Sequence, residues 1–313
     1  MQAFEYASPV NLQETIKLLP AEWGHTQVLA GGTDLISAMK DDVETPKRVV
    51  SLQHLHELKG VTFSPSAGLR LGAMASLDEI LDNTHVKQNY PALITAADGV
   101  RSQQLRNMGT IGGDLLQRPR CWYYRAGYGL LAMDQGKSLV PDGDNRYHAI
   151  LGNSGPAYFV SPSSFAPILI ALGAKAHLHG PGGQRTLPLE QLFVTPKSEG
   201  EREHSIKPNE VLTEITVPVH HGARMAVYEV RQKEAMDWPL AAAAVVLHLQ
   251  GSTVDGARVV LGHVAPVPWP APAAEAAGAA LKGATPLSQN AYKVQLAKVA
   301  VKRAIMQAVQ GGA

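Results

Sequence analysis

Two glycine pairs carry the residues of this chain that are best suited to chemistry. Residues 28–35 read V-L-A-G-G-T-D-L, and residues 106–115 read R-N-M-G-T-I-G-G-D-L. Each pair is entered from an apolar residue and followed by a small polar or acidic side chain. Together the two turns predict a fold in which two backbone loops enclose one extended anionic ligand.

Glycine suits a phosphate group because no Cβ blocks the approach of the backbone, and a turn into a helix presents several N–H donors. Two threonine hydroxyls would add further donors. The residues expected to donate are Gly31, Gly32, Thr33, Thr110, Gly112 and Gly113. The alternative is that each pair marks only a tight turn. Neither segment is a G-x-G-x-x-G or G-x-x-x-x-G-K-[ST] motif, which disfavours ordinary dinucleotide and P-loop sites.

Two structural units are expected to position these turns. In the first unit, a buried strand over 26–30 leads into the first glycine pair and a helix over 35–40 leaves it. A further strand is expected over 48–52. The second unit begins near residue 60 and is expected to contain a hairpin over 175–187 and a strand over 211–217.

A third unit follows residues 218–222. Its strands are expected over 226–230, 241–249 and 257–264, followed by a proline-rich connector over 266–272 and by helices over 273–281 and 289–309. On the last helix, one apolar stripe recurs at helical spacing and is expected to pack into the core. Its members are Tyr292, Leu296, Val299, Ile305 and Val309.

Composition excludes several classes of protein. The chain has 313 residues, of which 45% are hydrophobic and 18% charged, a globular balance. The net charge of +1 and the aromatic content of 6% argue against nucleic-acid binding. No apolar run is long enough for membrane insertion. No signal peptide is recognisable at the N-terminus, so a cytoplasmic location is expected, with export as the passenger of a partner left open.

The glycine segments and their surroundings resemble the FAD-binding subunit of molybdenum hydroxylases. This family includes xanthine dehydrogenase, carbon monoxide dehydrogenase medium subunits and bacterial aldehyde oxidoreductases. The resemblance extends along nearly the whole chain, through L-R-L-G-A at 69–73, S-P-S-S-F-A-P-I-L-I-A-L at 161–172, the segment 228–238, and A-R-V-V-L-G-H-V-A-P at 257–266. The order and spacing of these segments together are more specific than any one of them.

The resemblance implies an α+β fold. A two-subdomain α/β FAD-binding domain of the vanillyl-alcohol-oxidase type would precede a C-terminal three-stranded antiparallel sheet with helices. The boundaries we expect are 1–55 for the first subdomain, 56–218 for the second with an insertion at 118–158, and 223–313 for the C-terminal domain.

The resemblance also implies FAD as the cofactor and a set of binding residues. These are Val28, Leu29, Ala30, Gly31, Gly32, Thr33, Asp34, Leu35, Thr110, Gly112, Gly113, Asp114 and Ser164. Three positions depart from the family pattern. Many members have Asn at the position of Asp114 and Asp at that of Ser164, and Val230 stands where relatives often carry a Lys. Asp114 beside a diphosphate would be repulsive unless it meets a ribose hydroxyl or a backbone N–H. Ser164 would donate a hydrogen bond or cap its helix.

Residues 117–125, Q-R-P-R-C-W-Y-Y-R, resemble the start of an insertion that holds an iron–sulfur cluster in the aldehyde oxidoreductase branch. Cys121 is the only cysteine, so a four-thiolate cluster cannot form here. The aromatic residues Trp122, Tyr123 and Tyr124 would serve either a subunit interface or packing onto the parent domain.

Other candidate sites are weaker. The pairs His54/His56 and His177/His179 each share one face of a strand, but neither has an evident third ligand for a metal. The segment D-G-D-N at 142–145 lacks the downstream glutamate of a calcium loop. No G-x-S-x-G motif indicates a serine nucleophile. We therefore assign no metal ligand and no catalytic residue.

As the resemblance implies, the chain would be an oxidoreductase subunit that carries electrons through FAD. A large molybdopterin-binding subunit and a small [2Fe-2S] subunit would be its partners, and an external acceptor would receive the electrons. Two alternatives stay open. One is a stand-alone FAD oxidoreductase with its own substrate, and the other is a scaffold subunit whose flavin site has decayed.

Overall fold

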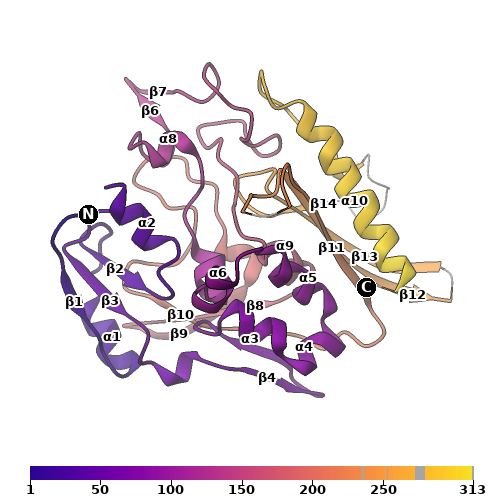
Figure 1. Ribbon diagram of the computed structural model, residues 1–313, viewed down its shortest axis with the longest axis horizontal. Helices are drawn as coiled ribbons and strands as arrows, with labels where there is room; N and C mark the ends of the chain where they lie inside the picture. Colours follow the sequence, from indigo (N-terminus) through magenta and orange to yellow (C-terminus); the bar gives the residue numbers. More distant parts are fainter. Residues whose placement is uncertain (235, 252, 272–278, 312–313) are drawn as a thin grey trace.

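The computed structural model describes residues 1–234, 236–251, 253–271 and 279–311. The N-terminal part forms a small parallel sheet in the order β1 (Glu5–Ala7), β3 (Arg48–Ser51), β2 (Thr26–Leu29). Helices α1 (Leu12–Leu18) and α2 (Leu35–Lys40) connect these strands (Figure 1). The first glycine pair therefore lies in the loop between β2 and α2, as expected.

A five-stranded antiparallel sheet follows, in the order β4-β5-β10-β8-β9. Its strands are β4 (Val61–Ser64), β5 (Gly68–Gly72), β8 (Lys175–Gly180), β9 (Gly183–Pro188) and β10 (Val211–Val217). Its helices are α3 (Leu77–Asp82), α4 (Thr84–Asn89), α5 (Pro91–Gly99), α6 (Gln103–Met108), α7 (Ile111–Leu116) and α9 (Ala166–Ala171). The second glycine pair lies within α7, because Thr110 caps the helix and its hydroxyl accepts from the N–H of Gly113.

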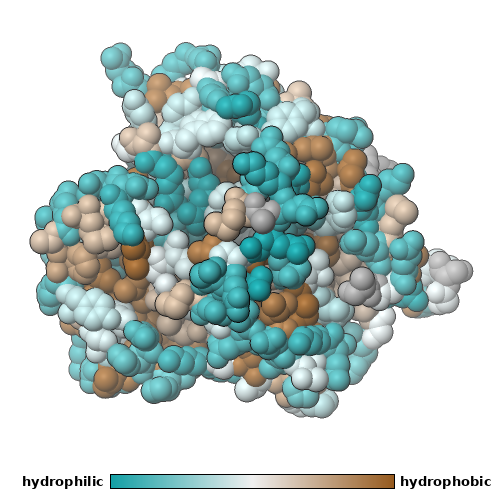
Figure 2. Space-filling model, in the orientation of Figure 1, coloured by the Kyte–Doolittle hydropathy of each residue, from teal (hydrophilic) through white to brown (hydrophobic). Residues whose placement is uncertain are grey.

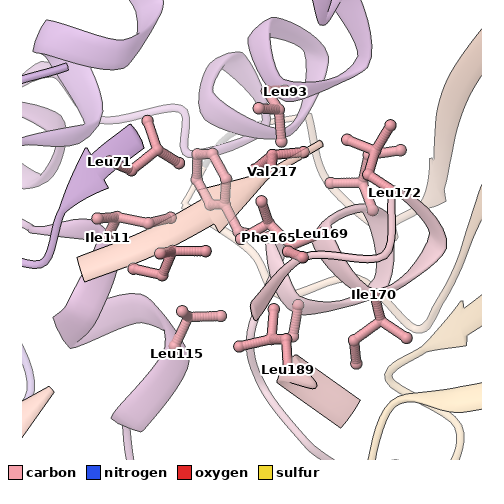
Figure 3. Close-up of a cluster of buried hydrophobic side chains, with 14 of the residues drawn as sticks. Leu71, Leu93, Ile111, Leu115, Phe165, Leu169, Ile170, Leu172, Leu189 and Val217 are labelled. Atoms are coloured by element: carbon pink, nitrogen blue, oxygen red, sulfur yellow. The ribbon is translucent and has the colours of Figure 1, made fainter. Parts of the chain in front are cut away.

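The large core of this part holds α7 in place (Figure 3). Ile111 and Leu115 of α7 are buried among leucines of the sheet and Phe165, which directly precedes α9. Residues four apart lie on one face of a helix, so the intervening Gly113 and Asp114 are directed away from this core. Packing of one face of α7 therefore decides which residues the other face presents.

The C-terminal part is an antiparallel sheet in the order β11-β12-β13-β14. Its three long strands are β11 (Arg224–Val230), β12 (Ala241–Gln250) and β13 (Thr253–Gly262), as expected. The structure adds a short edge strand, β14 (Trp269–Ala271), within the expected proline-rich connector. An edge strand tolerates Pro270 because one side of it needs no ladder hydrogen bonds. The expected helix over 273–281 falls mostly on residues 272–278, which lie outside the described residues.

Helix α10 (Tyr292–Gln310) packs against β11 and β12 (Figure 1). The predicted stripe is confirmed only in part: Leu296 and Ile305 pack against the core, whereas Tyr292 and Val309 are 40% and 46% exposed. The buried face instead comprises Lys293, Ala297, Ala300, Val301, Ala304 and Ala308. Small alanine side chains let the helix approach the sheet closely, whereas periodicity alone favours the larger apolar residues.

The insertion at 118–158 contains α8 (Trp122–Arg125) and the short hairpin β6 (Met133–Asp134) and β7 (Lys137–Ser138). Tyr124 is buried with Leu130, Leu131 and Phe159, so this aromatic residue packs within the chain. Hydrophilic side chains cover much of the face shown in Figure 2, broken by small hydrophobic patches. Among the described residues, no helix combines the length and apolar character needed to cross a bilayer.

Candidate functional site

The loop between β2 and α2 presents unused backbone donors. Within the described residues, no hydrogen bond engages the N–H groups of Gly31, Gly32 or Thr33. Gly32 has a φ of +76°, in the left-handed region that favours glycine. Three free N–H groups in succession before a helix form a concave anion site. This part of the expected donor set is available for a ligand.

Gly31 brings the two glycine segments into direct contact. A Cβ added at Gly31 would lie 1.6 Å from the carbonyl oxygen of Met108 and 3.3 Å from the Cα of Gly109. Only a residue without a side chain permits this approach. The two loops therefore form one continuous wall rather than two separate supports.

The second glycine segment differs from the expectation. The N–H of Ile111 donates to Ala75, that of Gly112 to Ala73, and that of Gly113 to the Thr110 hydroxyl. These donors are not free for a ligand. A Cβ on Gly112 would lie 2.8 Å from the Ala73 carbonyl oxygen, so this glycine serves close packing of α7 on the chain that follows β5.

Two hollows meet where the glycine segments touch. Each has a cavity volume of about 210 Å³. The first is lined by the β2–α2 loop and by residues from 202–212, and the second reaches Ser164 and Trp238. Residues common to both are Thr33, Asp34, Thr110, Gly113 and Gln117. A ligand with a central anionic group and a ring system at each end would span the two.

Asp34 ties the insertion to the first glycine loop. Its carboxylate accepts hydrogen bonds from the Arg118 N–H at 2.7 Å, from Arg120 at 2.7 Å and from Arg125 at 2.8 Å. Burial raises the pKa of Asp34, but the charges of Arg120 and Arg125 outweigh it and hold that pKa below 3.8. The carboxylate is thus occupied by arginines, although the residue also lines both hollows.

Asp114 meets a backbone N–H, one of the two arrangements that avoid repulsion. Its carboxylate accepts from the Ser163 hydroxyl, from the Phe165 N–H at 3.2 Å and from Gln117 at 3.1 Å. Burial raises its pKa to about 6, against the lowering effect of the Ser163 hydrogen bond. Asp114 therefore holds the turn before α9 against α7.

Ser164 lines the second hollow. Its neighbour Ser163, rather than Ser164 itself, makes the side-chain hydrogen bond to the start of α9. The Ser163 hydroxyl oxygen accepts from the Ala166 N–H at 2.9 Å. Glu229 lies beside Ser164. Burial raises the pKa of Glu229, and its ion pair with Arg231 opposes the rise. Arg231 also lines the second hollow, whereas Val230 does not.

Most of the expected binding residues line one or both hollows. The residues that line the first are Val28, Ala30, Gly31, Gly32, Thr33, Asp34, Leu35, Thr110, Gly112 and Gly113. Those that line the second are Thr33, Asp34, Thr110, Gly113, Asp114 and Ser164. Leu29 lines neither, and its Cδ1 is instead one of the atoms that a Cβ on Gly32 would meet.

Sequence reasoning missed Arg120. Its Nη1 donates to Asp34 and its Nη2 to Gln117 at 2.8 Å, and its guanidinium lies 4.5 Å from the ring centre of Trp238. Its buried Nε has no hydrogen-bond partner among the described residues. The sequence feature that could have indicated Arg120 is the pair of arginines in Q-R-P-R, directly after the second glycine segment. Arg202, which lies over Trp23 in the first hollow, left no comparable signal.

Comparison with known families agrees with this geometry. The family described as FAD binding domain in molybdopterin dehydrogenase matches residues 2–220. The chain belongs to this family of FAD-binding subunits. The CO dehydrogenase flavoprotein C-terminal domain family matches residues 226–286. Both matches identify the chain as a flavoprotein subunit of the molybdenum hydroxylase type, an oxidoreductase component with FAD as cofactor.

Individual relatives cover the chain at moderate identity. Aldehyde oxidoreductase FAD-binding subunit PaoB of Escherichia coli is 29% identical over 95% of this chain and 96% of its own length. Carbon monoxide dehydrogenase medium chain of Hydrogenophaga pseudoflava is 29% identical over 84% of this chain and 75% of its own. A solved carbon monoxide dehydrogenase from H. pseudoflava, lacking the Mo-pyranopterin moiety, matches with a TM-score of 0.76 and 26% identity, covering 100% of this chain and 99% of its own.

The residues present fit FAD. Gly31, Gly32 and Thr33 offer free N–H donors where the two hollows meet, which is where a diphosphate would lie between two ring systems. Arg120 lines the second hollow and is ion-paired with Asp34, a residue common to both hollows. Both features suit a ligand whose charge is at its centre.

Proposed function

We propose that this chain passes electrons from the [2Fe-2S] clusters of a partner subunit, through FAD, to an external acceptor. The observation that carries the proposal is the junction of two hollows beside three unused backbone donors. FAD supplies the chemistry when bound, because it accepts electrons singly and releases them in pairs. This chain holds the cofactor and shapes its surroundings.

We assign residues 28–35 to the diphosphate, with Gly31, Gly32 and Thr33 as donors and Thr110 and Gly113 on the opposite side. The remaining members of the binding set support these contacts. Leu29 acts through packing under the loop, Gly112 through close contact with the chain beyond β5, and Asp114 through the turn that carries Ser164. Asp34 holds Arg120 in position at the wall of the second hollow, where its guanidinium would lie beside the ligand.

No general acid or base is needed for this role. Asp114 and Glu229, the buried carboxyls near the second hollow, are engaged by Ser163 and by Arg231. A stand-alone oxidoreductase would need a free titratable group over the flavin. Every carboxylate that lines the two hollows accepts a hydrogen bond within the described residues, which disfavours that alternative.

We propose the same partners that the resemblance implies, a large molybdopterin-binding subunit and a small [2Fe-2S] subunit. We also retain the boundaries 1–55, 56–218 and 223–313 for the two FAD subdomains and the C-terminal domain. A cytoplasmic location is part of the same proposal, since the chain carries a single cysteine.

The test is co-expression with both partners and measurement of flavin in the purified complex. Stoichiometric FAD, reduced when substrate is added and reoxidised when acceptor follows, would support the proposal. A complex that shows no visible flavin absorbance, even after anaerobic reconstitution with FAD, would indicate a scaffold. Substrate oxidation by the isolated FAD-loaded chain would indicate a stand-alone enzyme.

A further inference from the structure

A short polar loop borders the first hollow. Two backbone hydrogen bonds form its base. The N–H of Val194 donates to the carbonyl oxygen of Glu203 at 3.0 Å, and the N–H of Ser205 donates to that of Leu192 at 2.8 Å. Chain ends held this close together enclose a compact surface loop. We call the enclosed residues, 195–202, the lid segment.

The lid segment buries little apolar surface. Its sequence is T-P-K-S-E-G-E-R, in which Pro196 is the single apolar side chain. Pro196 is buried and Arg202 is half-buried, whereas the other residues of the segment are exposed. Segments with few buried apolar contacts open locally at a low cost in free energy. Polar contacts, rather than a hydrophobic core, therefore keep the lid segment in its place.

The first of these contacts crosses the first hollow. Arg202 donates from Nη1 to Glu44 Oε1 at 3.4 Å, and its guanidinium lies 4.8 Å from the ring centre of Trp23. All three residues line the first hollow. Glu44 is itself held by the Tyr124 hydroxyl at 3.0 Å and by Gln27 at 2.8 Å. The contact therefore joins the segment before β10 to a fixed point in the N-terminal part of the chain.

The second contact lies outside the hollow. The Glu199 carboxylate accepts hydrogen bonds from the N–H groups of Leu130 at 2.9 Å and Leu131 at 2.8 Å, both in the insertion. Among the described residues, hydrogen bonds from the lid segment reach no other part of the chain. Glu199 lines neither hollow. Its contact can therefore be removed without changing the walls of the site.

We propose that residues 195–202 form a lid on the first hollow, and that this lid opens to admit and release FAD. Arg202 and Glu199 hold the lid closed, one across the hollow and the other against the insertion. A ring system in the first hollow lies between the β2–α2 loop and the segment that carries Arg202. The two backbone hydrogen bonds at the base stay intact when the tip moves, so opening breaks no strand of the sheet. This inference rests on the proposed function, because it places FAD in the hollow that the lid covers.

A lid has a kinetic consequence that a ligand contact lacks. Cofactor enters and leaves through the same opening, so a weaker hold on the lid raises the association and dissociation rate constants by the same factor. The dissociation constant then stays unchanged. Loss of a ligand contact instead raises mainly the dissociation rate constant. A substitution at Glu199 separates the two cases, because this residue lies outside the site.

The experiment is stopped-flow measurement of FAD association with the FAD-depleted full chain. Dissociation is followed with an excess of a second FAD-depleted flavoprotein that captures the released cofactor. Glu199→Ala removes the acceptor of two hydrogen bonds, so both rate constants should rise about tenfold while the dissociation constant stays within about twofold of the wild-type value. Glu199→Gln keeps one acceptor oxygen and should give a smaller rise in both.

Glu190→Ala is the matched control. It removes the same charge at an exposed residue of the 3₁₀ helix Leu189–Leu192, and its side chain makes no hydrogen bond within the described residues. Both rate constants of this variant should equal those of wild type. Circular dichroism identifies a variant that does not fold, and Glu199→Gln then decides the question.

Two results would overturn the lid. One is wild-type rate constants in both Glu199 variants, and the other is a rise in the dissociation rate constant alone, which would make Glu199 a support of the binding site. Either result, obtained with FAD still bound by the wild type, would leave the proposed function standing. A wild-type chain that binds no FAD would refute the proposed function and the lid together.

Discussion

Replacing Gly31 with alanine tests whether contact between the two glycine loops forms the FAD cradle. The new Cβ would lie 1.6 Å from the Met108 carbonyl oxygen, where ordinary contacts begin at 3.4 Å. The loops must therefore separate by about 1.8 Å, far beyond the tolerance of a hydrogen-bonded site. Losing two N–H contacts to a charged phosphate, at about 1.5–3 kcal/mol each, removes about 3–6 kcal/mol of binding energy. The dissociation constant for FAD should rise about 10²–10⁴-fold.

The assay is titration of the FAD-depleted full chain with FAD, followed by flavin absorbance. Gly182→Ala is the matched control, because a Cβ there meets no atom within 4 Å and FAD binding should be unchanged. Urea unfolding separates loss of the cradle from loss of the fold. Wild-type affinity for FAD in the folded Gly31→Ala variant would refute the reasoning.

Three further substitutions address the charged residues around the cradle. Asp34→Asn leaves Arg120 and Arg125 without their buried partner, so urea unfolding should show a loss of about 3–5 kcal/mol; a change under 0.5 kcal/mol would contradict this. Asp114 has a pKa of about 6 against 3.8 normally, so its charge costs the fold about 3 kcal/mol above pH 6 and nothing below about pH 4. The gain in free energy of unfolding from Asp114→Asn should therefore be about 3 kcal/mol larger at pH 7 than at pH 4. A pH-independent difference would show that the pKa of the Asp114 carboxyl is not raised. Arg120→Gln should weaken FAD binding about 10- to 100-fold by loss of a positive charge, whereas Arg146→Gln, at an exposed arginine that lines neither hollow, should bind FAD as wild type does; equal affinities would exclude Arg120 from the site.

Local patterns allowed much of the fold to be anticipated. The strands expected over 26–30 and 48–52 and the helix expected over 35–40 form as β2, β3 and α2. The strands of the C-terminal sheet also follow their apolar patterns, because side-chain periodicity reports directly on which face is buried. On α10 the predicted stripe holds only for Leu296 and Ile305, since periodicity could not show that mainly alanines face the sheet.

The candidate site was anticipated only in part. Glycine identity marks a turn, and Gly31, Gly32 and Thr33 do present free N–H groups. In the second segment the same residue types give their hydrogen bonds to neighbouring backbone and to a capping hydroxyl. Sequence cannot distinguish these outcomes, because the partner that takes a donor lies elsewhere in the chain.

The sequence by itself determined the first glycine turn and the strands of the C-terminal sheet, because these depend on residues close together along the chain. Only the tertiary structure decided the partners of Asp34, of Asp114 and of the buried Lys293. The Asp34–Arg120 contact joins residues 86 positions apart, and Lys293 reaches a carbonyl 146 positions away. Such contacts depend on how separate elements pack, and packing is a property of the assembled core rather than of any one segment.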